Sequence, residues 1–136
     1  MINNQIILYK FIQINNNVNW YRISYQYKLS ENFVREFQDK VDWYYISKYQ
    51  KLSENFIRKF QNEVYWDNIS IHQKLSESFI KEFKDEVIWF KISTHQKLSE
   101  NFIREFQDKV DWYRISRYQK LSEEFKSEFK HKLYGR

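Results

Sequence analysis

"LSENFIREFQDKVDWYRIS", residues 98–116, repeats "LSENFVREFQDKVDWYYIS", residues 29–47, with changes at two of nineteen positions. Two further copies lie between these stretches, and tryptophan marks a period of 23 residues, at Trp20, Trp43, Trp66, Trp89 and Trp112. A fixed period of about 20–50 residues is typical of a repeat protein. The sequence therefore predicts five units over residues 20–134, after a leader of residues 1–19 and before a tail of residues 135–136.

Each unit is expected to form two short helices. In the second unit, Trp43 and Ile46 have helical spacing, and so do Phe56, Phe60 and Val64 further along. The chain has one Gly and no Pro, so the tight turns of a multi-hairpin β fold are hard to build. The leucine-rich strand pattern is also absent. The prediction is an all-α solenoid of helix-turn-helix repeats, with about ten helices of roughly nine residues each and a leader.

Cap residues indicate where these helices start. A serine before the second apolar run can accept hydrogen bonds from the free amides of the first turn. This serine is present in every unit, as Ser30, Ser53, Ser76, Ser99 and Ser122. The first helix has a good cap in three units, at Asn19, Asp42 and Asp111, whereas Tyr65 and Ile88 are poor caps.

The repetition has a physical reason, because helices this short are marginal in water and one unit cannot cover its own apolar face. One apolar position, Ile103 in the fourth unit, becomes Lys126 in the last, so it is expected to face the following repeat. The leader keeps the register of the repeats at three positions, which predicts a degenerate half-repeat that covers the first tryptophan. The positions are Ile6, Ile14 and Val18, which correspond to Leu29, Phe37 and Val41. The alternative for residues 1–14 is a short strand.

Other polar positions also recur and favour structural roles. Glutamates fall in the first turn of the second helix, where negative charge suits the helix dipole. The mid-helix serines should allow close helix contact and bond to the preceding turn. A glutamine ladder is expected to bond to the backbone of a neighbouring repeat; its members are Gln50, Gln73, Gln96 and Gln119.

The pattern W-x-x-I-S-x-x-Q-x-L-S-E-x-F-I, read from "WYYISKYQKLSENFI" and its copies, resembles a short tandem repeat in proteins of giant amoeba-infecting DNA viruses and some phages. The likeness covers residues 20–129, and it departs at Tyr27, which replaces the later Gln, and at Lys126. The resemblance implies a viral or AT-rich microbial source and no biochemical activity.

Catalysis and cofactors are not expected. His72 and His95 stand one period apart, on units that should be about 10 Å from each other, which is too far to share a zinc ion. Their position is Tyr49 and Tyr118 in other units, so a varied surface residue is the better interpretation. The single Gly excludes a phosphate-cradling loop, and the regular carboxylates offer no paired acid–base site. We predict no enzyme, no metal and no cofactor.

Charge and hydropathy restrict the partners. No segment has the roughly 20 apolar residues that span a bilayer, and no secretory signal is evident, so a cytoplasmic location or a virion is expected. The net charge of +5 leaves nucleic acid as an alternative partner. Its contact would be a lysine ladder at the inter-helix turn that could follow a phosphate backbone, made of Lys28, Lys51, Lys74, Lys97 and Lys120.

The variable positions of the first helix favour a protein partner, from the host or the virus. Tyr and Arg are enriched at binding hot spots, and repeat proteins commonly bind along one extended face. The alternative is that these side chains only shield the edges of a thin layer. The predicted function is a non-catalytic protein-binding scaffold, monomeric or weakly self-associating. The candidate contact residues are Tyr21, Tyr25, Tyr44, Tyr45, Tyr49, Phe90, Tyr113, Arg114 and Tyr118.

Overall fold

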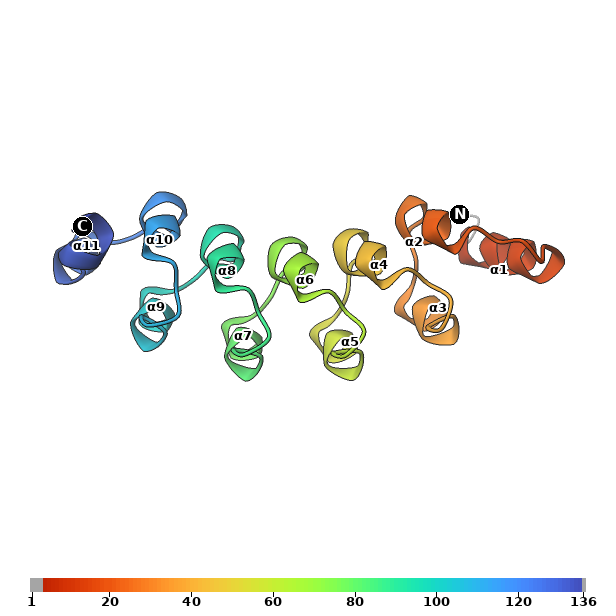
Figure 1. Ribbon diagram of the computed structural model, residues 1–136, viewed down its shortest axis with the longest axis horizontal. Helices are drawn as coiled ribbons and strands as arrows, with labels where there is room; N and C mark the ends of the chain where they lie inside the picture. The colour runs from red at the N-terminus through yellow and green to blue at the C-terminus, as the bar shows by residue number, and fades with distance from the viewer. Residues whose placement is uncertain (1–3, 136) are drawn as a thin grey trace. The chain divides into compact units, whose positions relative to one another are not determined.

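The computed structural model describes residues 4–135 and confirms an all-α helical repeat (Figure 1). The described residues form twelve helices and no strand. The chain divides into two compact units, Met1–Tyr65 and Trp66–Arg136. Within each compact unit, the first and second helices of the 23-residue repeats alternate along the chain, as the sequence predicts.

The helices of unit 1 are α1 (Asn4–Ile14), α2 (Trp20–Gln26), α3 (Glu31–Glu36), α4 (Trp43–Tyr49) and α5 (Glu54–Lys59). Those of unit 2 are α6 (Trp66–His72), α7 (Glu77–Glu82), α8 (Trp89–His95), α9 (Glu100–Glu105), α10 (Trp112–Tyr118), α11 (Glu123–Glu128) and α12 (Lys130–Tyr134). The first helices of adjacent repeats pack against each other: α2 contacts α4, α6 contacts α8, and α8 contacts α10.

The predicted caps are present. The Ser53 hydroxyl accepts from the Phe56 N–H at 3.1 Å, and the same bond starts each second helix. Asp42 and Asp111 cap α4 and α10, whereas Ile88 provides no side-chain cap for α8. The cap residues therefore fix the helix starts that the sequence indicated.

The two helices of each repeat are seven and six residues long, shorter than the predicted nine. The second helix stops at Phe60, whose ψ of 29° leaves the helical region. A single turn follows, closed by the Val64 N–H on the Phe60 carbonyl at 3.0 Å. This turn buries both Phe60 and Val64, which are four residues apart. The helical spacing of apolar residues therefore continues in the sequence beyond the end of the helix, which explains why the predicted helix was too long.

The core of each repeat is aromatic. In the second repeat, the Trp43 ring packs on Phe56 and Phe60, with ring centroids 6.2 and 5.1 Å apart. Ile46 and Phe56 have no exposed surface, so the two helices close on these side chains. Burial of this kind dominates the stability of small domains.

The glutamine ladder joins repeats through the backbone, as predicted. The Gln50 carbonyl accepts from the Leu29 N–H at 2.8 Å, and its amide donates to the Ser24 and Tyr27 carbonyls at 3.0 and 2.7 Å. Gln96 and Gln119 bond in the same way to the repeats that precede them in unit 2. One amide thus satisfies three backbone groups of the preceding repeat.

Two further side chains, a serine and a glutamate, form hydrogen bonds between adjacent repeats. The Ser24 hydroxyl donates to the Trp20 carbonyl in the preceding turn, as expected, and also accepts from the Asp42 N–H at 2.8 Å. The Glu31 carboxylate accepts from the Ser53 N–H and hydroxyl at 2.5 and 2.9 Å. The sequence assigned this glutamate only to the helix dipole, so the bond between repeats is a new finding.

The leader forms helix α1, so the strand alternative is wrong for residues 4–14. Its predicted register is also wrong, because Ile6 and Ile14 are 53% and 81% exposed. Instead, Gln5 bonds to the Ser30 N–H, as Glu31 bonds to Ser53. This pair is 25 residues apart where the repeats have 22, so α1 replaces a second helix with its register shifted by three residues.

The last repeat differs at two points. Lys126 is half-exposed and pairs with Glu123 at 3.4 Å, whereas Ile103, its equivalent in the preceding repeat, is fully buried. The turn after Phe129 continues into α12, an element that the sequence did not predict. In the earlier repeats the corresponding residue donates its N–H to a mid-helix serine, as Asp111 does to Ser93 at 3.0 Å, and the chain leaves the turn there.

Candidate binding surface

Six tyrosines of unit 1 contact one another on the outer side of α2 and α4, and we call them the tyrosine surface. Its members are Tyr21, Tyr25, Tyr44, Tyr45, Tyr49 and Tyr65. Neighbouring ring centroids lie 4.6 to 6.4 Å apart. All of them except the half-buried Tyr45 are more than 40% exposed, so five large aromatic side chains are displayed close together.

A hydroxyl pair lies at the centre of this surface. Tyr21 and Tyr45, from adjacent repeats, share a hydrogen bond of 2.7 Å, and their rings meet edge to face. The bond to Tyr21, together with partial burial, raises the pKa of Tyr45 from its ordinary value to about 12. The Tyr45 phenol therefore keeps its proton well above physiological pH.

Tyr65 belongs to the surface but was missed as a contact residue. Its ring lies 5.6 Å from that of Tyr44, edge to face, and its own N–H bonds to the Ser47 hydroxyl at 3.0 Å. The sequence marked it only as a poor helix cap. An aromatic residue where two other repeats have a capping Asp was the available signal.

The same positions bridge repeats in unit 2 with different chemistry. Asp67 and Lys91, which correspond to Tyr21 and Tyr45, form an ion pair of 3.4 Å. The next pair in register is Phe90 with Arg114, whose guanidinium lies 5.8 Å from the ring centroid. The variable positions thus come in cross-repeat pairs, which single-residue reasoning from the sequence did not detect.

The remaining predicted contact residues of unit 2 lie on its outer side. Tyr113 and Tyr118 are 56% and 50% exposed, and Arg114 is half-buried beside the Tyr113 ring. The nearby Tyr113 and Tyr118 phenols raise the pKa of the Arg117 guanidinium, so the cation persists at any ordinary pH. The outer positions of the first helices therefore carry both aromatic and cationic groups in unit 2, whereas in unit 1 they are mostly tyrosine.

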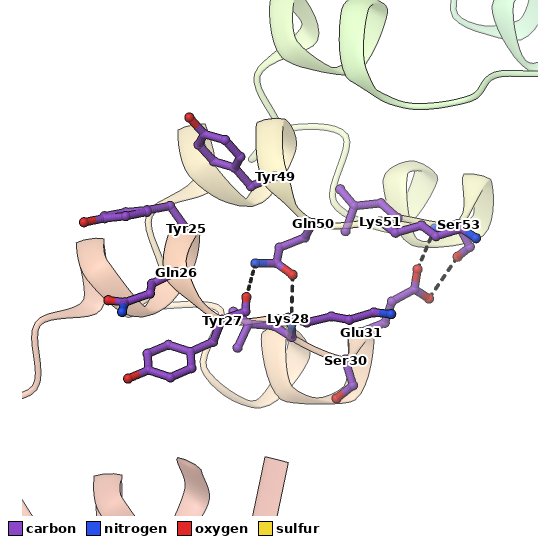
Figure 2. Close-up of a pocket in the computed structure, with 12 residues that line it drawn as sticks. Tyr25, Gln26, Tyr27, Lys28, Ser30, Glu31, Tyr49, Gln50, Lys51 and Ser53 are labelled. Atoms are coloured by element: carbon purple, nitrogen blue, oxygen red, sulfur yellow. Dashed lines mark hydrogen bonds between the residues drawn. The ribbon is translucent and has the colours of Figure 1, made fainter. Parts of the chain in front are cut away.

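A groove of about 630 Å³ opens beside the tyrosine surface in unit 1 (Figure 2). The extended linkers after α2 and α4 form it, and Leu29, Leu52 and Gln50 line it together with two of the predicted lysines, Lys28 and Lys51. Three tyrosines also line it, namely Tyr25, Tyr27 and Tyr49. The groove therefore combines aromatic rings with cations.

All five lysines of the predicted ladder are exposed, and none forms an ion pair within residues 4–135: Lys28, Lys51, Lys74, Lys97 and Lys120. Glu31, three residues after Lys28, also lines the groove, and its carboxylate accepts a hydrogen bond from the Ser53 N–H. Lys28 and Lys51 therefore keep their charges available at the groove.

No metal-binding arrangement emerges from the part of the chain that the structure describes. His72 and His95 are both exposed, and residues 4–135 contain no group of three His, Asp or Glu side chains placed to hold a metal ion. No helix among these residues is both long and apolar enough to cross a membrane.

Comparison with known proteins adds no family. No family model matches the chain, and neither a curated protein nor a solved structure does. The contacts described above are therefore the basis for a functional proposal.

Proposed function

We propose that this chain is a non-catalytic helical-repeat scaffold that binds a protein partner through the tyrosine surface. The observation that carries the proposal is the display of mutually contacting tyrosines across α2 and α4. Tyrosine supplies a large, rigid contact area at a low cost in conformational entropy, and it is enriched at binding hot spots.

Edge shielding alone is a weaker explanation for these tyrosines. In unit 2, Asp67 and Lys91 bridge adjacent repeats at the positions of Tyr21 and Tyr45, so the fold does not require aromatic residues there. The joints between repeats come from Gln, Ser and Glu, which barely vary. The outer positions of the first helices do vary from repeat to repeat, and repeat proteins commonly bind a partner along one extended face.

The resemblance to viral repeat proteins favours a host or viral protein as this partner. We place the interaction in the host cytoplasm or in the virion.

The unit 2 pair supplies a matched variant for the test. The double change Tyr21→Asp and Tyr45→Lys replaces the phenol pair with the ion pair found in unit 2, so the joint between repeats should survive. The control is the reverse change, Asp67→Tyr and Lys91→Tyr. Proteins recovered by cross-linking from a lysate of amoebae infected with a giant virus, after nuclease treatment, should be lost with the first variant and kept with the control. Equal recovery with both would contradict the proposal.

Nucleic acid is the second candidate, and the groove of unit 1 favours it. Base stacking on aromatic side chains and cations that follow the backbone together characterise single-strand binding, and Tyr27, Lys28 and Lys51 meet in this groove. The change of both lysines to Gln should then weaken binding of labelled single-stranded DNA and reduce its salt dependence, while Lys40→Gln should not. Absence of salt-dependent binding by the native chain would reject this candidate.

A further inference from the structure

Helix α1 is apolar on two sides. One side packs into unit 1, where Leu8 is 6% exposed and the Tyr9 ring lies 5.1 Å from Phe33. The other side carries Ile7, Phe11 and Ile14, which are 53%, 48% and 81% exposed. These three residues have the i, i+4, i+7 spacing of a continuous helical stripe. The stripe has no cover within residues 4–135.

A pocket deepens this stripe at its middle. Ile7, Leu8 and Phe11 enclose about 320 Å³ together with Tyr27, which lies just after α2. A second cavity of about 300 Å³, which Tyr27 also lines, continues toward Arg22 on α2. The pocket is large enough for a bulky apolar side chain of a partner to be buried in it.

Tyr27 breaks the repeat pattern at this pocket. The other four repeats have glutamine here, and Gln50 shows its role, with two bonds to the linker after α2, at Tyr27 and Leu29, and one to Ser24 in α2. Before Tyr27 the chain supplies a helix, α1, and no such linker, so an amide would lack these partners. The position carries instead an aromatic ring that is 45% exposed and lines the pocket.

The segments that form the pocket carry only positive charges, and the nearby Glu31, which lines the adjoining groove with Tyr27, has its carboxylate bonded to Ser53. Residues 4–30 contain Lys10, Arg22 and Lys28 and no Asp or Glu. Glu36, the carboxylate that interacts with Tyr9, acts on the side of α1 that is packed into the unit. An apolar stripe with a cationic rim is complementary to an amphipathic segment whose polar side is acidic.

We propose that the stripe of α1 and the pocket at Tyr27 dock an acidic amphipathic helix of a partner protein. An apolar side chain of this helix enters the pocket, and its acidic side faces Lys10, Arg22 and Lys28. The three-residue stripe on α1 matches a partner helix with apolar residues at the same spacing. This site goes beyond the proposed function, because it uses no residue of the tyrosine surface.

The test selects ligands for the full-length chain from a random library of displayed 16-residue peptides. Enriched peptides should carry excess Asp and Glu, with aliphatic or aromatic residues three to four positions apart. Their affinity should fall about tenfold with Tyr27→Gln, which introduces the residue of the other repeats, and similarly with Phe11→Ser. The matched control, Tyr118→Gln in unit 2, should bind like the native chain.

Three outcomes would overturn the proposal. The first is enrichment of peptides without acidic amphipathic character, and the second is equal binding of the selected peptides to the Tyr27→Gln variant. The third uses vesicles of phosphatidylserine and phosphatidylcholine. If the chain sediments with them, loses this with Tyr27→Gln and selects no acidic peptide, the surface binds anionic lipid instead.

Discussion

The Glu100 carboxylate accepts two hydrogen bonds from Ser122 in the next repeat, from its backbone N–H at 2.6 Å and from its hydroxyl at 2.9 Å. The serine hydroxyl also caps α11, by accepting from the Phe125 N–H at 3.1 Å. One serine therefore starts its own helix and receives the carboxylate of the preceding one. Since the same clasp joins Glu77 to Ser99, the start of a second helix depends on the repeat before it.

The first prediction concerns the pH dependence of this clasp. The backbone N–H of Ser122 lowers the pKa of Glu100 below its ordinary value, so the folded state releases this proton more readily than the unfolded state. The stabilisation is therefore present above the unfolded pKa of about 4.3 and is lost as the pH falls through the lower folded value. Glu100→Gln should reduce stability at pH 7 and flatten its fall in acid, as measured by urea unfolding. Asp108→Asn, at an exposed carboxylate without a bonded partner, should leave the native profile unchanged.

The second prediction concerns the glutamine ladder. Gln50→Ala removes the partner of the Leu29 N–H and of the Ser24 and Tyr27 carbonyls. Because Gln50 is buried, water cannot easily replace these bonds, and the free energy of unfolding should fall by about 2–4 kcal/mol. Chemical denaturation measures the change, with Gln13→Ala on the exposed side of α1 as the control. A loss below about 0.5 kcal/mol would show that the ladder contributes little.

The third prediction exploits the missing cap of α8. Ile88→Asp introduces the residue that caps α4 and α10, and it should stabilise the chain by about 1 kcal/mol. Asp111→Ala should destabilise it by a similar amount, because the Arg114 N–H loses its acceptor. Thermal unfolding followed by circular dichroism tests both. The same sign for both changes would argue against capping as the cause.

The fourth prediction concerns the phenol pair. Because the folded pKa of Tyr45 is about 12, its contribution to stability is present below the unfolded tyrosine value of about 10 and is lost as the pH rises through 12. Tyr21→Phe removes the hydrogen bond and should return one phenol to ordinary titration in ultraviolet absorbance. Tyr113→Phe, at a tyrosine outside the pair, should leave the late-titrating phenol in place.

The fifth prediction concerns the last repeat. Lys126→Ile restores the apolar residue that the other repeats bury at this position, and its exposure should promote concentration-dependent self-association. Sedimentation velocity over a range of concentrations measures this, and Lys130→Ile serves as the control at an exposed neighbouring position. If Lys126→Ile stays monomeric at all concentrations, this position does not face a following repeat.

Periodicity and cap residues predicted the repeat fold, the helix caps and the glutamine ladder. Ser53 and Asp42 fix helix starts through bonds within a few residues, and such local signals are readable in sequence. Gln50 was assigned correctly because a buried amide that recurs once per repeat needs a backbone partner. The serine is present in all five repeats and the glutamine in four, so one correct interpretation extends to the other copies.

The leader could not be placed in the same way. Its residues show an apolar pattern compatible with more than one register, and only the contact from Gln5 to Ser30 in three dimensions decides between them. The cross-repeat pairs were missed for a related reason. Tyr21 and Tyr45 are 24 residues apart, so their pairing follows from how α2 packs on α4 and not from a local spacing.

The joints also constrain how such a gene can change in length. Gln50 bonds to Leu29, 21 residues before it, and the Tyr65 amide bonds to Ser47, 18 residues before it. Each bond between repeats therefore requires a fixed number of residues between its two partners. A duplication of one whole period preserves every count, whereas the gain or loss of a single codon inside a period misaligns the next joint. We therefore expect related chains to differ in the number of repeats more readily than in the length of the period.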